Sequence, residues 1–140
     1  MIWDKLDEQD WKKAAPYVDT VLVAVCDIKP ENKLDLSSQT SRTVYVASEI
    51  ERQLKGRVML MPPVSYLSNE PWFQSYVSSI RSRAEKGGFR HLFFVVEERV
   101  LETTPGVDWG TALTVSGDDN SDAQIRQLCE QIVRQWQEEV

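Results

Sequence analysis

The chain has 140 residues, of which 41% are hydrophobic, and it carries a formal net charge of −6 at pH 7. This length suits one domain with a single sizeable core. A nucleic-acid binder needs a basic stripe to neutralise phosphates, and the sequence has none, so we expect no nucleic-acid partner. No apolar run approaches the roughly 20 residues that span a bilayer, and the polar start MIWDKLDEQD is unlike a signal peptide. We therefore expect no membrane partner and a cytoplasmic location.

The first half of the chain predicts two helices and two strands, in the order helix 7–18, strand 20–26, helix 41–55 and strand 57–61. Asp7 or Asp10 is expected at the start of the first helix, where a carboxylate satisfies free backbone N–H groups. The first strand, TVLVAVC, is apolar and β-branched without alternation, which is typical of a parallel strand buried on both faces. Pro62 is expected to end the second strand.

The second half begins with a better-marked helix that ends at Lys86. Its apolar residues recur at helical spacing, and they are Phe73, Tyr76, Val77, Ile80 and Ala84. Ser68 or Asn69 is expected to cap its start. A continuous apolar strand, HLFFVVE, follows at 91–97, and a further strand is expected at 111–115.

The stretch between these last two strands, ERVLETTPGVDWG, shows no helical periodicity. Strand 111–115 is therefore reached either by a bare parallel crossover or as the return arm of a hairpin. We favour the hairpin, which would make this strand antiparallel. A final helix is expected after a capping box at Ser121–Gln124, with an apolar stripe that includes Cys129.

Strands that alternate with helices predict a single α/β domain over residues 1–140. We expect a three-layer open sheet, mostly parallel, with four strands and helices on both faces. The four strands are 20–26, 57–61, 91–97 and 111–115. Cys26 and Cys129 lie on apolar elements without a CxxC spacing, so we interpret both as buried thiols.

Ligands of such sheets bind outside the carboxyl ends of the parallel strands. This rule selects Asp27 after the first strand, Tyr66 and Asn69 after the second, and Glu97 after the third as candidate ligand-binding residues. Asp118 and Asp119 join them if strand 111–115 is parallel. The alternative interpretation is structural: Tyr66 covers the sheet edge and Asn69 caps a helix. Trp109 lies in the polar stretch VDWG and is a candidate interface residue if it is exposed.

The sequence predicts no catalytic residue, no metal site and no cofactor. The one histidine, His91, begins a strand and therefore lies at the wrong edge for a nucleophile or a zinc ion. The alternative hypothesis is a hydrolase that binds a divalent metal through the hard oxygen ligands of Asp27, Glu97 and Glu98.

Three strings carry a family resemblance, and they are WKKAAPYVDTVLVAV, ERQLKGRVMLMPPVSYL and GFRHLFFVV. On these strings the chain resembles the YpiF family, uncharacterised small cytosolic proteins of spore-forming Gram-positive bacteria. That resemblance implies no site residues.

The order of elements, with PP-x-x-Y after the second strand, is more distantly similar to the creatininase family of metal-dependent amidohydrolases. The places that match that family's metal ligands hold Asp27–Glu31, Ser68–Asn69 and Glu97–Arg99, without its histidines or its glycine-rich turn. This similarity implies a creatininase-like fold that lacks the metal-ligand residues.

We therefore predict a non-catalytic α/β domain that binds a protein partner or a small ligand at the carboxyl edge of its strands. A homodimer built through an aromatic surface is a further hypothesis, with Trp3, Trp11 and Trp109 as its candidates.

Overall fold

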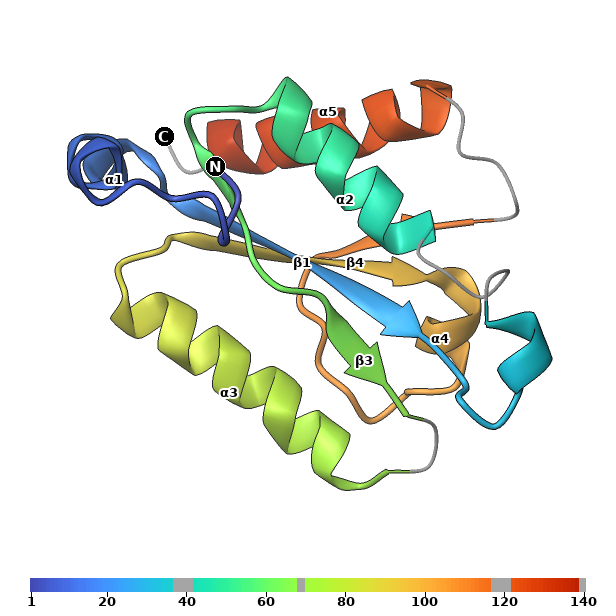
Figure 1. Cartoon of the computed structure of the whole chain (residues 1–140). Helices are drawn as coiled ribbons and strands as arrows, with labels where there is room; N and C mark the ends of the chain where they lie inside the picture. Colours follow the sequence, from blue (N-terminus) through green and yellow to red (C-terminus); the bar gives the residue numbers. More distant parts are fainter. Residues whose placement is uncertain (37–41, 68–69, 117–121, 139–140) are drawn as a thin grey trace.

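The computed structural model describes residues 1–36, 42–67, 70–116 and 122–138. Its five strands form one sheet in the order β2-β1-β4-β5, with β3 also paired to β1. They are β1 (Thr20–Asp27), β2 (Val58–Leu60), β3 (Val64–Tyr66), β4 (His91–Glu97) and β5 (Ala112–Val115). Every pairing among them is parallel. Figure 1 shows the arrowheads of β1, β3 and β4 pointing to one edge, beside α4 (Glu98–Glu102).

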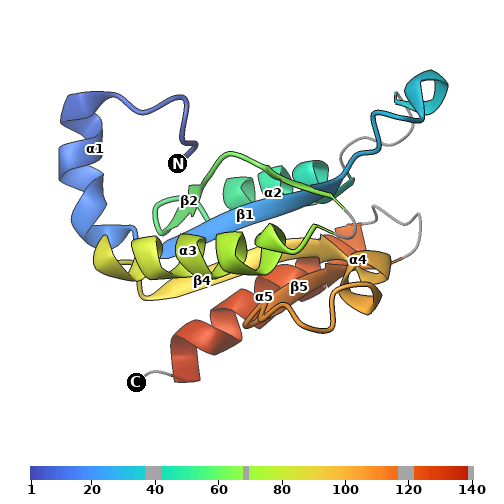
Figure 2. The ribbon, with the colours of Figure 1, turned by 90° about the horizontal axis from the view of Figure 1, so that it is seen from below.

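Helices cover both faces of this sheet (Figure 1). Helices α2 (Arg42–Gln53) and α5 (Asp122–Glu138) lie on one face, and α3 (Trp72–Lys86) lies on the other. The predicted three-layer open α/β sheet is therefore confirmed. Figure 2 shows α1 (Glu8–Ala14) standing away from the sheet, and this helix has no buried residue.

Strand β1 holds the layers together because all eight of its residues are buried. Alternate side chains point to opposite faces of a strand. Leu22 and Ala24 therefore join the core under α2 and α5, whereas Val21 and Val23 join the core under α3.

The direction of β5 differs from the hairpin that the sequence analysis favoured. This strand pairs parallel to β4, with Phe94 opposite Ala112 and Glu97 opposite Val115. The prediction of an antiparallel strand was wrong because the intervening residues 98–111 are long enough for a parallel crossover. The short helix α4, which the sequence pattern did not indicate, begins that crossover.

The edge next to β1 is interrupted where the sequence carries two prolines. Leu60 lies opposite Leu22 in β2, whereas Val64 lies opposite Val25 in β3, so the edge chain gains one residue relative to β1. This is the geometry of a β-bulge. Pro62 ends the predicted strand, as expected, but the chain then resumes pairing as β3, which was not predicted. Ile2 forms a further parallel bridge to Leu60 on the outer side of β2.

The start of α1 is capped by a residue that the sequence analysis selected. Asp7 caps α1 by accepting hydrogen bonds from the backbone N–H groups of Gln9 and Asp10, as predicted. The proposed caps Ser68, Asn69 and Ser121 lie outside the described residues.

Among the helices that the structure describes, none combines the length and the apolar character needed to cross a membrane.

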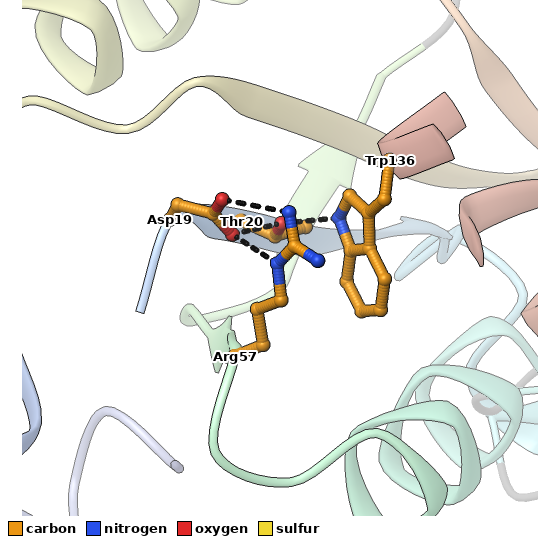
Figure 3. Close-up of polar contacts among 4 residues, drawn as sticks. All are labelled: Asp19, Thr20, Arg57 and Trp136. Atoms are coloured by element: carbon orange, nitrogen blue, oxygen red, sulfur yellow. Dashed lines mark hydrogen bonds and ion pairs between the residues drawn. The ribbon is translucent and has the colours of Figure 1, made fainter. Parts of the chain in front are cut away.

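A polar cluster joins three elements at the amino edge of the sheet (Figure 3). The guanidinium of Arg57 donates to both carboxylate oxygens of Asp19, at 2.9 and 3.0 Å, and lies 4.0 Å from the ring centre of Trp136. Thr20 donates to Asp19 at 2.9 Å and accepts from the indole N–H of Trp136 at 2.9 Å. Gly56, at a φ of +94°, forms the left-handed turn that precedes Arg57. The cluster therefore fixes α5 to the starts of β1 and β2.

These contacts change the pKa of Asp19. Burial alone would raise it, but the hydrogen bonds from Arg57 and Thr20 and the charge of Arg57 lower the pKa below its ordinary value of 3.8. A carboxyl group with a lowered pKa stabilises the fold above its unfolded-state pKa. That contribution is lost as the pH falls through the lower folded-state pKa.

We expect Asp19→Asn to lower the free energy of unfolding at pH 7, because the bidentate pair with Arg57 is lost. The difference from the unsubstituted protein should shrink as the pH falls below 3.8, the ordinary value for this group. Urea unfolding at a series of pH values measures both effects. Asp4→Asn, which changes an exposed carboxylate, is the matched control, and an equal pH dependence in the two variants would contradict the assignment.

Candidate functional site

The strand order places a topological switch point between β1 and β4. The chain leaves β1 towards β2 and β3 on one side, and β4 then pairs on the opposite side of β1. Ligands of open parallel sheets bind at the carboxyl edge beside such a point. Asp27 ends β1, Tyr66 ends β3 and Glu97 ends β4, so these three predicted residues lie at that edge. Asn69, Asp118 and Asp119 lie outside the described residues.

Two of the predicted carboxylates meet at the switch point. The Nε of Arg99 lies 3.4 Å from an oxygen of Asp27 and 3.0 Å from an oxygen of Glu97. The side chain of Asp27 is only 8% exposed, whereas that of Arg99 is 59% exposed. Arg99 is the second residue of α4, directly after β4. One guanidinium cation therefore lies between two carboxylates and offsets half of their combined charge.

This arrangement bears on the hypothesis of a metal hydrolase. Glu98, its third proposed ligand, is an exposed residue of α4. Within the described ranges, no group of three or more His, Cys, Asp and Glu residues is arranged to hold a metal ion. The geometry at Asp27 and Glu97 therefore favours an ion-pair cluster, and the metal hydrolase stays a prediction from sequence.

Tyr66 makes structural contacts at the end of β3. Its side chain is 5% exposed, and its ring lies edge-on against Phe73 with ring centres 5.2 Å apart. Its hydroxyl lies 3.1 Å from the hydroxyl of Thr103. Thr103 donates its one hydroxyl hydrogen to the carbonyl of Val100 at 3.0 Å, so Tyr66 is the donor in this pair. The interaction joins β3 to the end of α4.

Trp109 corrects the prediction of an exposed interface residue. It is 6% exposed and packs against Phe73 and Phe94. Its indole N–H donates to the hydroxyl of Thr104 at 2.9 Å, which satisfies the polar end of the ring inside the core. Trp3, by contrast, is 43% exposed. The homodimer hypothesis therefore loses Trp109 as an exposed candidate and otherwise stays a prediction.

Cys26 lies beside this edge but shows no activation. Burial raises the pKa of its thiol, and the charge of Glu97 raises it further. A raised thiol pKa keeps the group protonated and weakly nucleophilic. His91 begins β4 and so lies at the amino edge, far along the strand from Asp27 and Glu97, as predicted.

A cavity of about 310 Å³ opens at the carboxyl edge, between the start of α3 and the loop after α4. Tyr66 and Phe73 form its aromatic side, and Glu70, Gln74 and Thr103 are among the polar residues around it. Sequence reasoning selected Tyr66 but missed Gln74 and Thr103. The Thr-Thr-Pro-Gly turn signal at 103–106 was the one available pointer to the second wall.

Residues 9–115 match the family described as "Protein of unknown function (DUF2487)". Over 68 residues the chain is 35% identical to the "Uncharacterized protein YpiF" of Bacillus subtilis (strain 168), which covers 48% of this chain and 46% of the relative. The match thus spans about half the length of that curated relative. No solved structure matches the chain.

The resemblance to the YpiF family is therefore confirmed. The similarity to the creatininase family stays a prediction.

We expect Arg99→Gln to lower the free energy of unfolding by about 1 kcal/mol, the upper range for a partly exposed ion pair. The loss should be smaller in a protein that already carries Asp27→Asn, because the two groups then no longer interact. Urea unfolding of the two single variants and the double variant gives their coupling energy. Arg126→Gln, on the exposed face of α5, is the control, and additive effects of Asp27→Asn and Arg99→Gln would contradict the pairing.

Proposed function

The chain belongs to the family described as "Protein of unknown function (DUF2487)", which assigns no activity, and we propose from its geometry that it is a non-catalytic domain that binds a small molecule at the carboxyl edge of its sheet. The observation that carries this proposal is the cavity of about 310 Å³ that Tyr66 at the end of β3, the start of α3 and the loop after α4 enclose. Its volume is at the lower end of the range for small-molecule sites, roughly 300–1,000 Å³. We place this binding domain in the cytoplasm, in keeping with its two free cysteine thiols.

The cavity combines an aromatic side with side chains that form hydrogen bonds. Phe73 and Tyr66 offer ring surface, while Gln74 and Thr103 offer amide and hydroxyl groups. A few polar groups placed against an apolar wall orient a bound molecule. The Tyr66 hydroxyl donates to Thr103, so its free lone pairs are available as acceptors for a ligand.

The charge at this edge favours a neutral or cationic ligand. Glu70 lines the cavity itself, and Glu98 and Glu102 are exposed on α4 beside it. The positive charge of Arg99 is already balanced by Asp27 and Glu97. An anion would meet uncompensated carboxylates here, whereas an amine or a polyol would find acceptors.

The absence of activated groups at the predicted positions supports a binding role over a catalytic one. The thiol of Cys26 has a raised pKa because it is buried, and Arg99 is held in ion pairs with two carboxylates. These groups maintain the shape of the edge. A protein partner at the same edge is the alternative occupant.

A fragment screen observed by ¹H–¹⁵N correlation NMR tests this proposal. The probes are amines, amides and polyols, with carboxylates of matched size for comparison. We expect cationic and neutral fragments to shift the backbone signals of Gln74, Gly106 and Val107, because these residues line the cavity. Gln74→Ala should weaken the best fragment, since the amide contributes a hydrogen bond worth about 1 kcal/mol.

The control is Gln127→Ala, which changes an exposed glutamine of α5 on the opposite face of the sheet. The proposal fails if no fragment shifts the signals at this edge, or if carboxylates shift them as strongly as amines. Equal effects of Gln74→Ala and Gln127→Ala on binding would also contradict it.

A further inference from the structure

A second hollow lies on the α3 face of the sheet, away from the carboxyl edge. It has a volume of about 340 Å³. Val21 and Val23 of β1 form its floor, and Met61–Val64 forms one wall. The opposite wall belongs to α3, and Phe89 closes one end. Apart from Arg83 and Tyr76, every side chain that lines this hollow is apolar.

The interrupted sheet edge explains why this space is open. Between Leu60 and Val64 the edge chain contains one residue more than β1 does, and this excess residue bends the chain away from regular pairing. Pro62 and Pro63 have no backbone N–H and cannot restore the ladder. On the facing wall, Ala84 of α3 carries only a methyl group. Neither side therefore fills the space between them.

The two polar residues of the hollow lie on one face of α3. Tyr76, Ile80 and Arg83 all line it, and residues at this spacing share one side of a helix. Arg83 is the one charged residue among those that line the hollow. No ion pair or hydrogen bond to a described residue engages its guanidinium, and the residue is exposed. A long side chain of this kind lays its aliphatic stem along an apolar wall and holds its charge at the mouth.

We propose that this hollow binds a small amphipathic carboxylate, a molecule with an unbranched apolar chain and one terminal carboxylate. The apolar floor and walls would take the chain, and Arg83 would pair with the carboxylate at the mouth. The guanidinium fork matches a carboxylate in a bidentate geometry. The hydroxyl of Tyr76 is a second donor on the same face. From Tyr76 to Arg83 the helix rises about 10 Å, which suits a chain of medium length.

This site is independent of the one at the carboxyl edge. The two cavities share no lining residue. Their charges are also opposite, since Glu70 lines the edge cavity and Arg83 lines this one. A carboxylate that suits this hollow is therefore disfavoured at the edge cavity.

Titration calorimetry with three probes tests the proposal: octanoate, 1-octanol and acetate. Octanol carries the chain without the charge, and acetate carries the charge without the chain. We expect octanoate to bind about tenfold more tightly than octanol, a difference of about 1.4 kcal/mol, and acetate to show no binding. Arg83→Gln should remove this advantage and leave the binding of octanol unchanged.

Two further variants separate the site from general charge effects. Lys86→Gln removes one positive charge from the end of α3 at a residue that does not line the hollow, so it should not change the binding of octanoate. Ala84→Phe should fill the hollow and abolish the binding of both octanoate and octanol. Because Ala84→Phe could prevent folding, NMR shifts of Val23, Ala84 and Phe89 in the unsubstituted protein locate the ligand without it.

The proposal is overturned if octanoate does not bind, or if it binds no more tightly than octanol. Equal losses from Arg83→Gln and Lys86→Gln would also overturn it. So would octanoate-induced NMR shifts confined to residues outside the hollow. A result at the carboxyl edge leaves this proposal unaffected, since the fragments expected there are cationic or neutral.

Discussion

Strand β1 is enclosed on both edges and both faces, and the rest of the molecule is arranged around this enclosure. Strand β4 pairs along one edge, and β2 and β3 share the other. Its alternate side chains enter two separate cores. The interior positions of a strand so placed carry apolar residues, because their side chains do not reach water. Its polar ends are then the only places where it can meet charged groups, and Asp19 and Asp27 stand at those two ends.

Both ends use an arginine from a neighbouring element to balance the carboxylate. At the amino end, Arg57 pairs with Asp19 and also covers the ring of Trp136 (Figure 3). At the carboxyl end, Arg99 pairs with Asp27 and Glu97. Burying a carboxylate without a partner is costly, so each pair permits the strand to end inside the protein. The arginines come from the turn before β2 and from α4, and these contacts tie the edge elements to the centre.

The sequence predicted the features that depend on local pattern. The apolar runs of β1 and β4 and the helical stripe around Phe73 and Val77 were identified correctly. The direction of β5 depends on how residues 98–111 cross the sheet, and periodicity carries no information about that path. Strand β3 was missed because it has three residues, includes the exposed Ser65 and follows two prolines.

The candidate site was predictable in position but not in its contacts. The predicted order of strands placed Asp27 and Glu97 at the same edge of the sheet. In the structure they end β1 and β4 at that edge. Their partner Arg99 was among the residues after that strand, but only the fold brings it between two carboxylates. The partner of Tyr66 lies 37 residues away in sequence. Trp109 was predicted to be exposed because its neighbours in sequence are polar. In the fold its ring lies in the core, and its N–H donates to the hydroxyl of Thr104.

The interrupted edge of the sheet has a consequence for association between molecules. A long exposed edge strand presents a row of unpaired backbone groups that another chain can extend, and this leads to aggregation. Here Leu60 already exchanges hydrogen bonds with Met1 and Trp3 on its outer side. Pro62 and Pro63 then remove two backbone donors before β3 begins, and β3 has only three residues. No continuous template for intermolecular strand pairing remains along this side of the described sheet.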